Sequence, residues 1–425
     1  MSRPAQGRVL GRARGLLRRR AGMLAFFAVV GPGLITASAD NDAQGITTYS
    51  LVGARTGYGL LWLLIPAMIA LVVTQEIGAR IGIVTGKGLG ALIRERFGVR
   101  PAAFAMLMLL VANLATTAAE FAGIAASLEI FGVSKYISVP VAAVLVLVLV
   151  AKGGYKRVER VLLVLSAVFI AYVISGLLAH PDWGQAVHGL LTPTFGGKSI
   201  FVLTAVGMVG TTVTPWGQFF IQGYVVDKGL GPDDLRYERL DVFLGQLAMC
   251  IVVLFIIVAT AATIHVHGGS IVDAKDAALA LRPLAGRFAE TLFAVGLLNA
   301  SLMAANILPL STSYAVCEAF GFELGLDEPV REAPVFFGTI AFSIAFGAII
   351  ILIPGISLVP VLFLSAVVNG LLLAPLFVYL YLLANDRDLM GELRNGRLAN
   401  VLTIVTIVLL IALTIVLVGA QFVGT

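Results

Sequence analysis

The sequence predicts an all-α polytopic membrane protein, with two groups of five helices arranged as an inverted repeat and an eleventh helix after them. Composition is the first reason: 59% of the 425 residues are hydrophobic and 12% are charged, with a mean hydropathy of +0.99. Soluble domains carry about 25% charged residues. The second reason is a series of eleven apolar segments of membrane-spanning length. The third is that the first and sixth segments are both interrupted by polar residues, glycine or proline.

The eleven predicted spans divide the chain into two repeats. They cover residues 22–54 (broken), 58–83, 101–131, 136–152, 158–179, 199–224 (broken), 240–264, 288–318, 333–353, 356–383 and 398–422. Spans one to five (22–179) form the first repeat, and spans six to ten (199–383) form the second. Residues 398–422 are the additional helix, and residues 1–21 are a basic tail without apolar periodicity.

Lys and Arg are distributed unequally between the two sides of this arrangement. With the N-terminus inside, 22 of them fall on the inner side and 6 on the outer side. Cytoplasmic loops are enriched in these residues, so we expect a multi-pass protein of the bacterial plasma membrane with a cytoplasmic N-terminus. The net charge of +5 reflects these loops and does not indicate nucleic-acid binding. The expected partners are the lipid bilayer and the ions described below, and no obligate protein partner is evident.

The first span carries a polar run in its middle, Asp40-Asn41-Asp42 followed by Gln44 and Gly45. Ionisable groups at membrane depth are expensive and usually line a substrate path. A helix that breaks there exposes carbonyl groups on one half and N–H groups on the other, and both can hold ions. We therefore interpret the run as half of an ion site.

Two other interpretations of the first span remain open. The Arg-rich start, an apolar stretch and Ala37-Ser38-Ala39 fit a signal peptide with an A-x-A cleavage site. Gly31-Pro32-Gly33 in the apolar stretch weakens that interpretation. The run is also compatible with an ordinary loop between two short helices.

The sixth span supplies the expected second half of the site. Pro215 lies between Gly210 and Gly217 and follows Thr211 and Thr214. Proline removes a helix hydrogen bond and clashes with the preceding turn. The break comes five spans after the first one, where an inverted repeat would place it, and paired interruptions of this kind point to a transport site.

Other polar residues in the spans allow two interpretations each. Glu120 in span three either lines the site or bonds a neighbouring helix. Asn369 in span ten either reaches the site or bonds a neighbour. Glu76 and Arg80, four residues apart, are expected to pair on one helix face.

Several classes of function are disfavoured. Cys250 and Cys317 both lie in apolar segments and do not suggest a disulfide framework. The four histidines lie in or near predicted loops, and no His-Glu-x-x-His motif is present, so a membrane-embedded zinc hydrolase is not expected. We expect no enzymatic activity and no cofactor.

Four motifs resemble the natural resistance-associated macrophage protein (NRAMP) family. They are Gly31–Gly33 with the polar break after it, Gly57–Trp62, Ile83–Lys87 and Asn385–Gly391. The resemblance extends over nearly the whole chain. It implies the LeuT-type fold, with helices 1 and 6 broken, and the transport of divalent transition metals with protons.

The first-helix motif departs from the usual family pattern. The family has Asp-Pro-Gly-Asn, and the corresponding residues here are Asp42-Ala43-Gln44-Gly45. The resemblance therefore keeps the acidic ligand as Asp42 and loses the amide ligand at Gly45.

The sixth-helix motif departs as well. The family has Ala-x-x-Met-Pro-His, whereas Thr211–Trp216 places Thr214 at the methionine and Trp216 at the histidine. In span three, only Glu120 remains of two family carboxylates, with Thr117 at the other position. This combination resembles the NRAMP-related magnesium transporter branch.

The chemistry of the predicted ligands agrees with that resemblance. Without Met or His the site offers only oxygens, which suit Mg²⁺, Ca²⁺ and Mn²⁺, and Mg²⁺ keeps several of its waters. The candidate metal ligands are Asp42, Thr211, Thr214, Ala39, Gly45, Asp40, Gln44 and Asn369. Glu120, Trp216 and Gln218 are the candidates for proton handling or for supporting the ligands.

We therefore expect transport of Mg²⁺, and also of Mn²⁺, by alternating access with weak or no proton coupling. The metal is the transported substrate and not a cofactor. One alternative is a proton-coupled Mn²⁺ or Fe²⁺ transporter. The other is a sodium-coupled symporter of an organic solute, which would require helix N-termini facing a substrate carboxylate.

Overall fold

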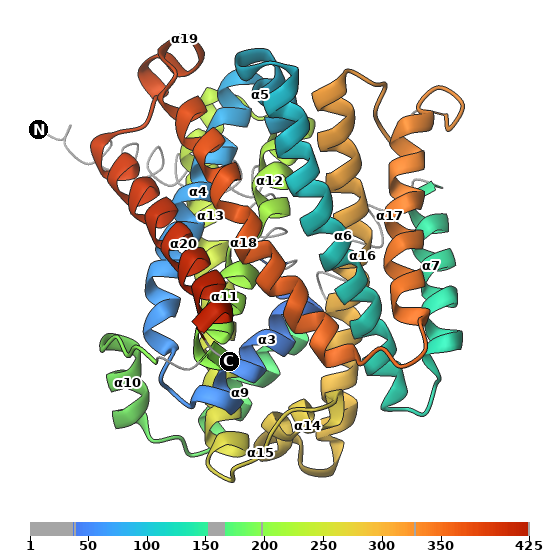
Figure 1. Ribbon diagram of the computed structural model, residues 1–425, viewed down its shortest axis with the longest axis vertical. Helices are drawn as coiled ribbons and strands as arrows, with labels where there is room; N and C mark the ends of the chain where they lie inside the picture. Colours follow the sequence, from blue (N-terminus) through green and yellow to red (C-terminus); the bar gives the residue numbers. More distant parts are fainter. Residues whose placement is uncertain (1–36, 38–39, 152–165, 197–198, 327–328, 424–425) are drawn as a thin grey trace, which may run out of the picture.

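The computed structural model describes residues 37, 40–151, 166–196, 199–326 and 329–423, and every regular element in these ranges is helical. The long helices are α4 (Leu64–Thr85), α6 (Val99–Glu129), α7 (Lys135–Ala151), α11 (Ser199–Thr212), α12 (Pro215–Asp227), α13 (Leu235–Thr260), α16 (Ala289–Phe320), α17 (Pro334–Leu352), α18 (Leu358–Asn385) and α20 (Arg397–Val423). Figure 1 shows them side by side in one bundle.

Further elements connect or complete these helices. The α-helical ones are α3 (Ala43–Thr56), α5 (Leu89–Phe97), α9 (Ile170–Leu178), α10 (Trp183–Leu191), α14 (Ala274–Ala278), α15 (Arg282–Ala285) and α19 (Arg387–Met390). Short 3₁₀ turns are η1 (Leu61–Leu63), η2 (Ser166–Phe169), η3 (Pro232–Asp234), η5 (Leu279–Leu281), η6 (Gly286–Phe288) and η7 (Gly391–Leu393), and η4 (Ala261–His265) is π-helical. In Figure 1, α5 and α19 lie at one end of the bundle, and α10, α14 and α15 lie at the other.

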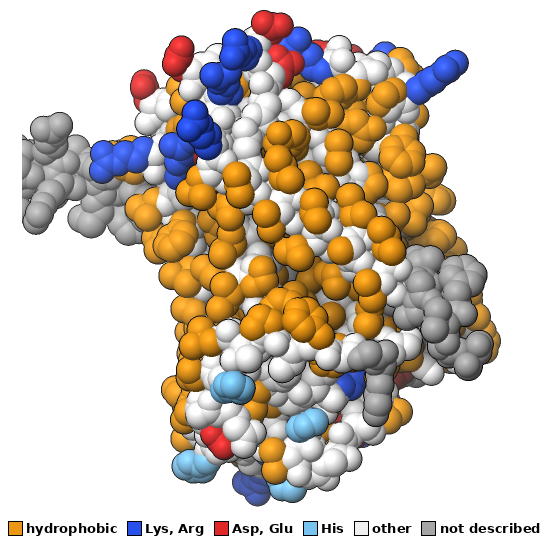
Figure 2. All heavy atoms as spheres, turned by 60° about the vertical axis from the view of Figure 1, so that its left-hand side comes forward, with side chains coloured by type: hydrophobic (Ala, Val, Ile, Leu, Met, Phe, Trp, Pro, Cys, Tyr) orange, Lys and Arg blue, Asp and Glu red, His pale blue; other side chains and the backbone are white. Residues whose placement is uncertain are grey.

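The prediction of a polytopic membrane protein is confirmed. Eight helical stretches of the described residues are long and apolar enough to cross a membrane. Two shorter apolar helices, Lys135–Val150 and Ala167–Leu178, occupy the fourth and fifth predicted spans, and α3 occupies the second half of the first. Figure 2 shows a broad hydrophobic band across the middle of the face that it draws, with Lys and Arg side chains gathered mainly at one end. A bilayer would cover such a band.

Some sequence predictions lie outside the described residues. These are the basic tail (1–21), the first half of the broken first span including Ala39, and residues 152–165 at the junction of spans four and five. The segment between the fifth and sixth predicted spans contains α10, whose N-cap Asp182 accepts a hydrogen bond from Gln185 N at 2.9 Å.

The break in the sixth span has the predicted position. α11 ends at Thr212, and α12 begins at Pro215. Thr214 between them is extended, with φ −96° and ψ 143°. Because proline lacks an N–H group and has a fixed φ, it suits the first position of a helix and not its interior. The first span breaks in the same manner, since Asn41 and Asp42 are non-helical and α3 starts immediately after them.

Glycines allow the broken helices to pack closely against their neighbours. A Cβ atom on Gly210 of α11 would overlap the carbonyl oxygen of Ala366 and the backbone of Gly370, both on α18. A Cβ atom on Gly53 of α3 would overlap Thr260 of α13. Small residues at such crossings let helix backbones approach in membranes, and here they hold both breaks in the core.

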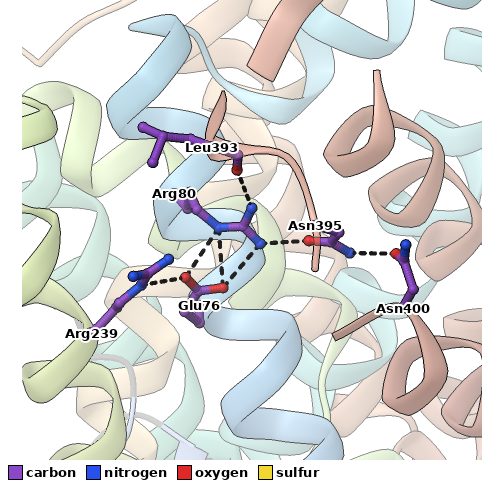
Figure 3. A network of polar contacts seen from close by, with 6 residues as sticks. All are labelled: Glu76, Arg80, Arg239, Leu393, Asn395 and Asn400. Carbon is purple, nitrogen blue, oxygen red and sulfur yellow. Dashed lines mark hydrogen bonds and ion pairs between the residues drawn. The ribbon is translucent and has the colours of Figure 1, made fainter. Parts of the chain in front are cut away.

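A polar network at the Lys/Arg-rich end joins three helices (Figure 3). Arg80 Nε lies 3.1 Å from Glu76 Oε1, which confirms the predicted pair on α4. Arg239 of α13 lies 2.7 Å from the same carboxylate oxygen. Arg80 also donates from Nη2 to Asn395 Oδ1 at 2.5 Å, and Asn395 donates to Asn400 Oδ1 of α20 at 3.0 Å.

Candidate metal centre

The N-terminus of α3 is held by two carboxylates. Asp42 is its N-cap, and Asp42 Oδ1 accepts a hydrogen bond from Gly45 N at 2.6 Å. Glu120 of α6 accepts one from Ala43 N through Oε2 at 3.3 Å. Carboxylates are favourable at a helix N-terminus because they satisfy free N–H groups and oppose the positive end of the helix dipole. Glu120 therefore bonds a neighbouring helix and also lies beside Asp42.

A hydrogen bond between side chains joins the two helix breaks. Thr214 Oγ1, at the N-cap of α12, donates to Asp40 Oδ1 at 3.2 Å. Both residues are fully enclosed, with 1% and 0% of their surfaces exposed. The predicted meeting of the first and sixth spans is thus a direct contact between side chains.

Gly45 leaves a gap that oxygen atoms surround. A Cβ atom at this position would lie 3.1 Å from the Asp40 carbonyl oxygen, 3.1 Å from Asp42 Oδ1 and 3.4 Å from Thr211 Oγ1. A carboxylate, a carbonyl and a hydroxyl oxygen, from both breaks, thus face one point. Any larger residue at 45 would compete for that space.

Gln44 and Asn369 form a hydrogen-bonded bridge beside the gap. Gln44 Nε2 donates to Thr211 Oγ1 at 3.3 Å, and Gln44 Oε1 accepts from Ser365 Oγ of α18 at 2.7 Å. Asn369 Nδ2 lies 3.5 Å from the same Gln44 oxygen and donates to Thr116 Oγ1 at 2.9 Å. Both predicted ligands are thus engaged with neighbouring helices, and Gln44 orients Thr211.

Three buried carboxylates at the site each keep one oxygen without a hydrogen-bond partner among the described residues. These atoms are Asp40 Oδ2, Asp42 Oδ2 and Glu120 Oε1. Burying an ionised carboxylate without a partner is very costly, so the site calls for a cation or for protons. Within the described residues no group of three or more His, Cys, Asp and Glu is arranged to hold a metal ion. A bound cation would therefore rely on hydroxyl, carbonyl and water oxygens in addition to carboxylate.

The remaining predicted residues lie beside the break. Trp216 is 1% exposed, and its backbone carbonyl accepts a hydrogen bond from Ser311 Oγ at 3.4 Å. Gln218 is 0% exposed and lies two residues further along α12. Trp216 offers no metal-binding nitrogen, because the indole N–H is a donor only.

Sequence reasoning did not single out two neighbours of the site. Ser365 contacts Gln44, and it precedes Asn369 by four residues on α18, a spacing that places both on one helix face. Cys250 of α13 interacts electrostatically with Asp40. No local pattern indicated Cys250, because its proximity depends on how α13 packs.

A helical membrane protein whose first and sixth spans break at one shared, buried, oxygen-rich site has the architecture of the LeuT-type secondary transporters. The family can also be stated. The family model described as "Natural resistance-associated macrophage protein-like" matches residues 33–420, and the chain belongs to that family.

Individual relatives agree with this assignment. The divalent metal cation transporter MntH of Bacillus subtilis is 27% identical over 418 residues, which cover 96% of this chain and 95% of the relative. The manganese transporter of Eremococcus coleocola, solved with an aromatic bis-isothiourea compound, superposes with a TM-score of 0.74 at 22% identity, covering 94% of this chain and 87% of that one. MHP1, a nucleobase-cation-symport-1 family transporter, superposes with a TM-score of 0.58 at 18% identity over 92% of each chain. The predicted LeuT-type fold is confirmed.

Proposed function

We propose that this protein carries Mg²⁺, and also Mn²⁺, across a bacterial plasma membrane by alternating access, with weak or no proton coupling. Its relative in Bacillus subtilis is named a divalent metal cation transporter, and the similar Eremococcus coleocola structure is a manganese transporter. These names support a divalent metal substrate. The excess of Lys and Arg at one end of the molecule supports a cytoplasmic N-terminus.

The observation that carries the choice of ion is the gap at Gly45. Three oxygens of different chemical type lie within 3.4 Å of the position that a Cβ atom would take. Because glycine has no side chain, these oxygens stay uncovered at position 45. A Mg²⁺ ion bound beside them would meet an oxygen directly at about 2.0–2.1 Å or through one of its own water molecules. Oxygen ligands suit Mg²⁺ and Mn²⁺, whereas softer metals gain from sulfur or imidazole.

The case for weak proton coupling rests on Trp216 and Glu120. Histidine is the side chain whose unperturbed pKa lies nearest to neutrality, and tryptophan stands at its family position. Of the two span-three carboxylates, Glu120 remains and Thr117 replaces the other. One Glu120 oxygen bonds the N-terminus of α3, which ties this carboxylate to the fold.

A proton-coupled Mn²⁺ or Fe²⁺ transporter is the second candidate. The observation in its favour is the second oxygen of Glu120, which has no partner among the described residues and lies close to Asp42. A sodium-coupled organic symporter has weaker support, because the likeness to MHP1 at 18% identity concerns the fold alone.

Competition for Mn²⁺ uptake into liposomes separates these candidates. We expect external Mg²⁺ to inhibit uptake in a concentration-dependent manner, and amino acids and nucleobases to have no effect. Inhibition by Fe²⁺ but not by Mg²⁺ would favour the second candidate. Inhibition by an organic solute, together with a requirement for Na⁺, would favour the symporter.

A further inference from the structure

Three buried glutamines lie between the metal centre and the Lys/Arg-rich end of the bundle: Gln75 of α4, Gln218 of α12 and Gln246 of α13. Each is 0% exposed. Within the part of the chain that the structure describes, neither polar atom of any of the three carboxamides has a hydrogen-bond partner. An unsatisfied buried polar group costs about 1–3 kcal/mol. Three complete carboxamides in this state therefore indicate polar occupants such as water.

A hydrogen bond and an electrostatic interaction of Asp40 indicate the depth of two of these glutamines. Thr214 bonds Asp40, and Gln218 follows Thr214 by four residues. Cys250 interacts electrostatically with Asp40, and Gln246 precedes Cys250 by four residues. Four residues of helix correspond to about 6 Å along the axis. Gln218 thus lies about one turn from Thr214 at the metal centre, and Gln246 lies about one turn from Cys250 on a different helix.

An apolar cluster of buried residues lies on the other side of the glutamines. Its members are Ala79, Ile83, Ile221, Val225, Leu235 and Val242. Each glutamine lies three or four residues from a member on its own helix: Ala79 on α4, Ile221 on α12 and Val242 on α13. In Figure 1, α4 and α12 run toward the Lys/Arg-rich end, and α13 runs away from it. On each of the three helices, the glutamine therefore lies on the side of the cluster that is nearer to the metal centre.

We propose that Gln75, Gln218 and Gln246 form a second site for the transported ion, which they hold through the ion's own water molecules between the metal centre and the apolar cluster. This inference rests on the proposed function. Carboxamide oxygens accept hydrogen bonds from cation-bound water, and water-mediated contacts are nearly as favourable as direct ones. The three residues carry no charge, which makes the site weak enough to release the ion as conduction requires.

The proposed glutamine site should affect the transport of Mg²⁺ most, because this ion keeps much of its hydration shell. Mg²⁺ loses water reluctantly, so it needs groups that replace its outer hydration when it leaves the metal centre. Apolar side chains at the glutamine positions would remove those groups and leave the path otherwise intact. The effect should therefore be larger for Mg²⁺ than for Mn²⁺.

The test compares Gln218→Leu and Gln246→Leu with wild type. Gln222→Leu is the matched control, because Gln222 lies on α12 with its Nε2 bonded to the Lys87 carbonyl oxygen at 2.9 Å, beyond the proposed site. Mg²⁺ and Mn²⁺ uptake into liposomes and the melting temperature are measured for each protein. We expect both site variants to lower the ratio of Mg²⁺ to Mn²⁺ uptake at least about fivefold. The control should leave this ratio unchanged.

The melting temperature distinguishes a transport role from a structural one. Replacing an unpartnered buried amide by leucine should leave the melting temperature unchanged or raise it. Lower melting temperatures with equal losses of Mg²⁺ and Mn²⁺ uptake would overturn the second site and assign the glutamines to packing. Unchanged ratios in stable variants would overturn it as well, with the proposed function intact. Wild type without Mg²⁺ uptake would overturn the proposed function and this inference together.

Discussion

The hydroxyl of Thr214 and the carboxylate of Asp40, 174 residues apart in the chain, form a hydrogen bond of 3.2 Å. This bond joins the break of the sixth span to that of the first. Beside it, the gap at Gly45 is faced by oxygens from the same two breaks. The candidate metal centre therefore lies at the contact between the two broken helices, and changes at either break should alter ion transport.

Asp42→Ala should abolish divalent cation uptake and leave the protein folded. Loss of the N-cap of α3 costs about 1 kcal/mol, and removal of a buried carboxylate offsets part of that cost. Uptake into liposomes and elution as a single detergent-solubilised species check the two statements. Asp182→Ala is the control, because Asp182 caps the exposed helix α10 in the same way. Uptake by the Asp42 variant at the wild-type rate would exclude Asp42 as a ligand.

Gly45→Ala should reduce Mg²⁺ uptake about tenfold or more, because the methyl group would lie 3.1 Å from two site oxygens and occupy space needed by ion-bound water. Gly296→Ala on α16 is the matched control. There the new Cβ atom would meet Val168 at an ordinary distance of 3.5 Å. If both variants transport equally well, the gap at Gly45 has no role in ion binding.

Thr214→Met should raise the affinity for Cd²⁺ and lower Mg²⁺ uptake. The change adds a soft sulfur ligand, removes a hydroxyl and fills volume available to water. Thr214→Val separates these effects, because it also loses the hydrogen bond to Asp40 but gains no sulfur. Calorimetric titration with Cd²⁺ should show tighter binding for the methionine variant alone. Tight Cd²⁺ binding by wild type would contradict the assignment of an oxygen-only site.

Arg80→Met should lower the melting temperature, with a loss of about 2–4 kcal/mol of stability. Arg80 is 3% exposed, and its removal leaves Glu76 with Arg239 and deprives Asn395 of its donor. The control is Lys87→Met, which breaks an exposed ion pair with Glu95 and should cost about 1 kcal/mol or less. Similar melting temperatures for the two variants would show that the network of Figure 3 does not stabilise the bundle.

The features that could be predicted from the sequence are those that depend on residues close together in the chain. Pro215 ends one helix and begins another because of its own ring, and Glu76 and Arg80 pair because four residues make about one helical turn. The cost of placing Asp40 and Asp42 in a membrane pointed to the site without any knowledge of packing.

The remainder depends on contacts between helices that are distant in the chain. Gln44 was a possible ligand by composition, but its oxygen accepts a hydrogen bond from Ser365, 321 residues away. The interaction between Cys250 and Asp40 arises from the packing of α13. Gly45 could be recognised as a missing amide ligand, whereas the oxygens that face it became visible only in three dimensions.

The most direct test of the proposed function records Mg²⁺ and pH together inside liposomes that contain the purified protein. With an inward Mg²⁺ gradient, we predict a rise in internal Mg²⁺ that is absent with Asp42→Ala, and no internal acidification beyond that of empty liposomes. Acidification that depends on Mg²⁺ would contradict weak proton coupling. The absence of Mg²⁺ entry under conditions in which Mn²⁺ enters readily would contradict magnesium transport itself.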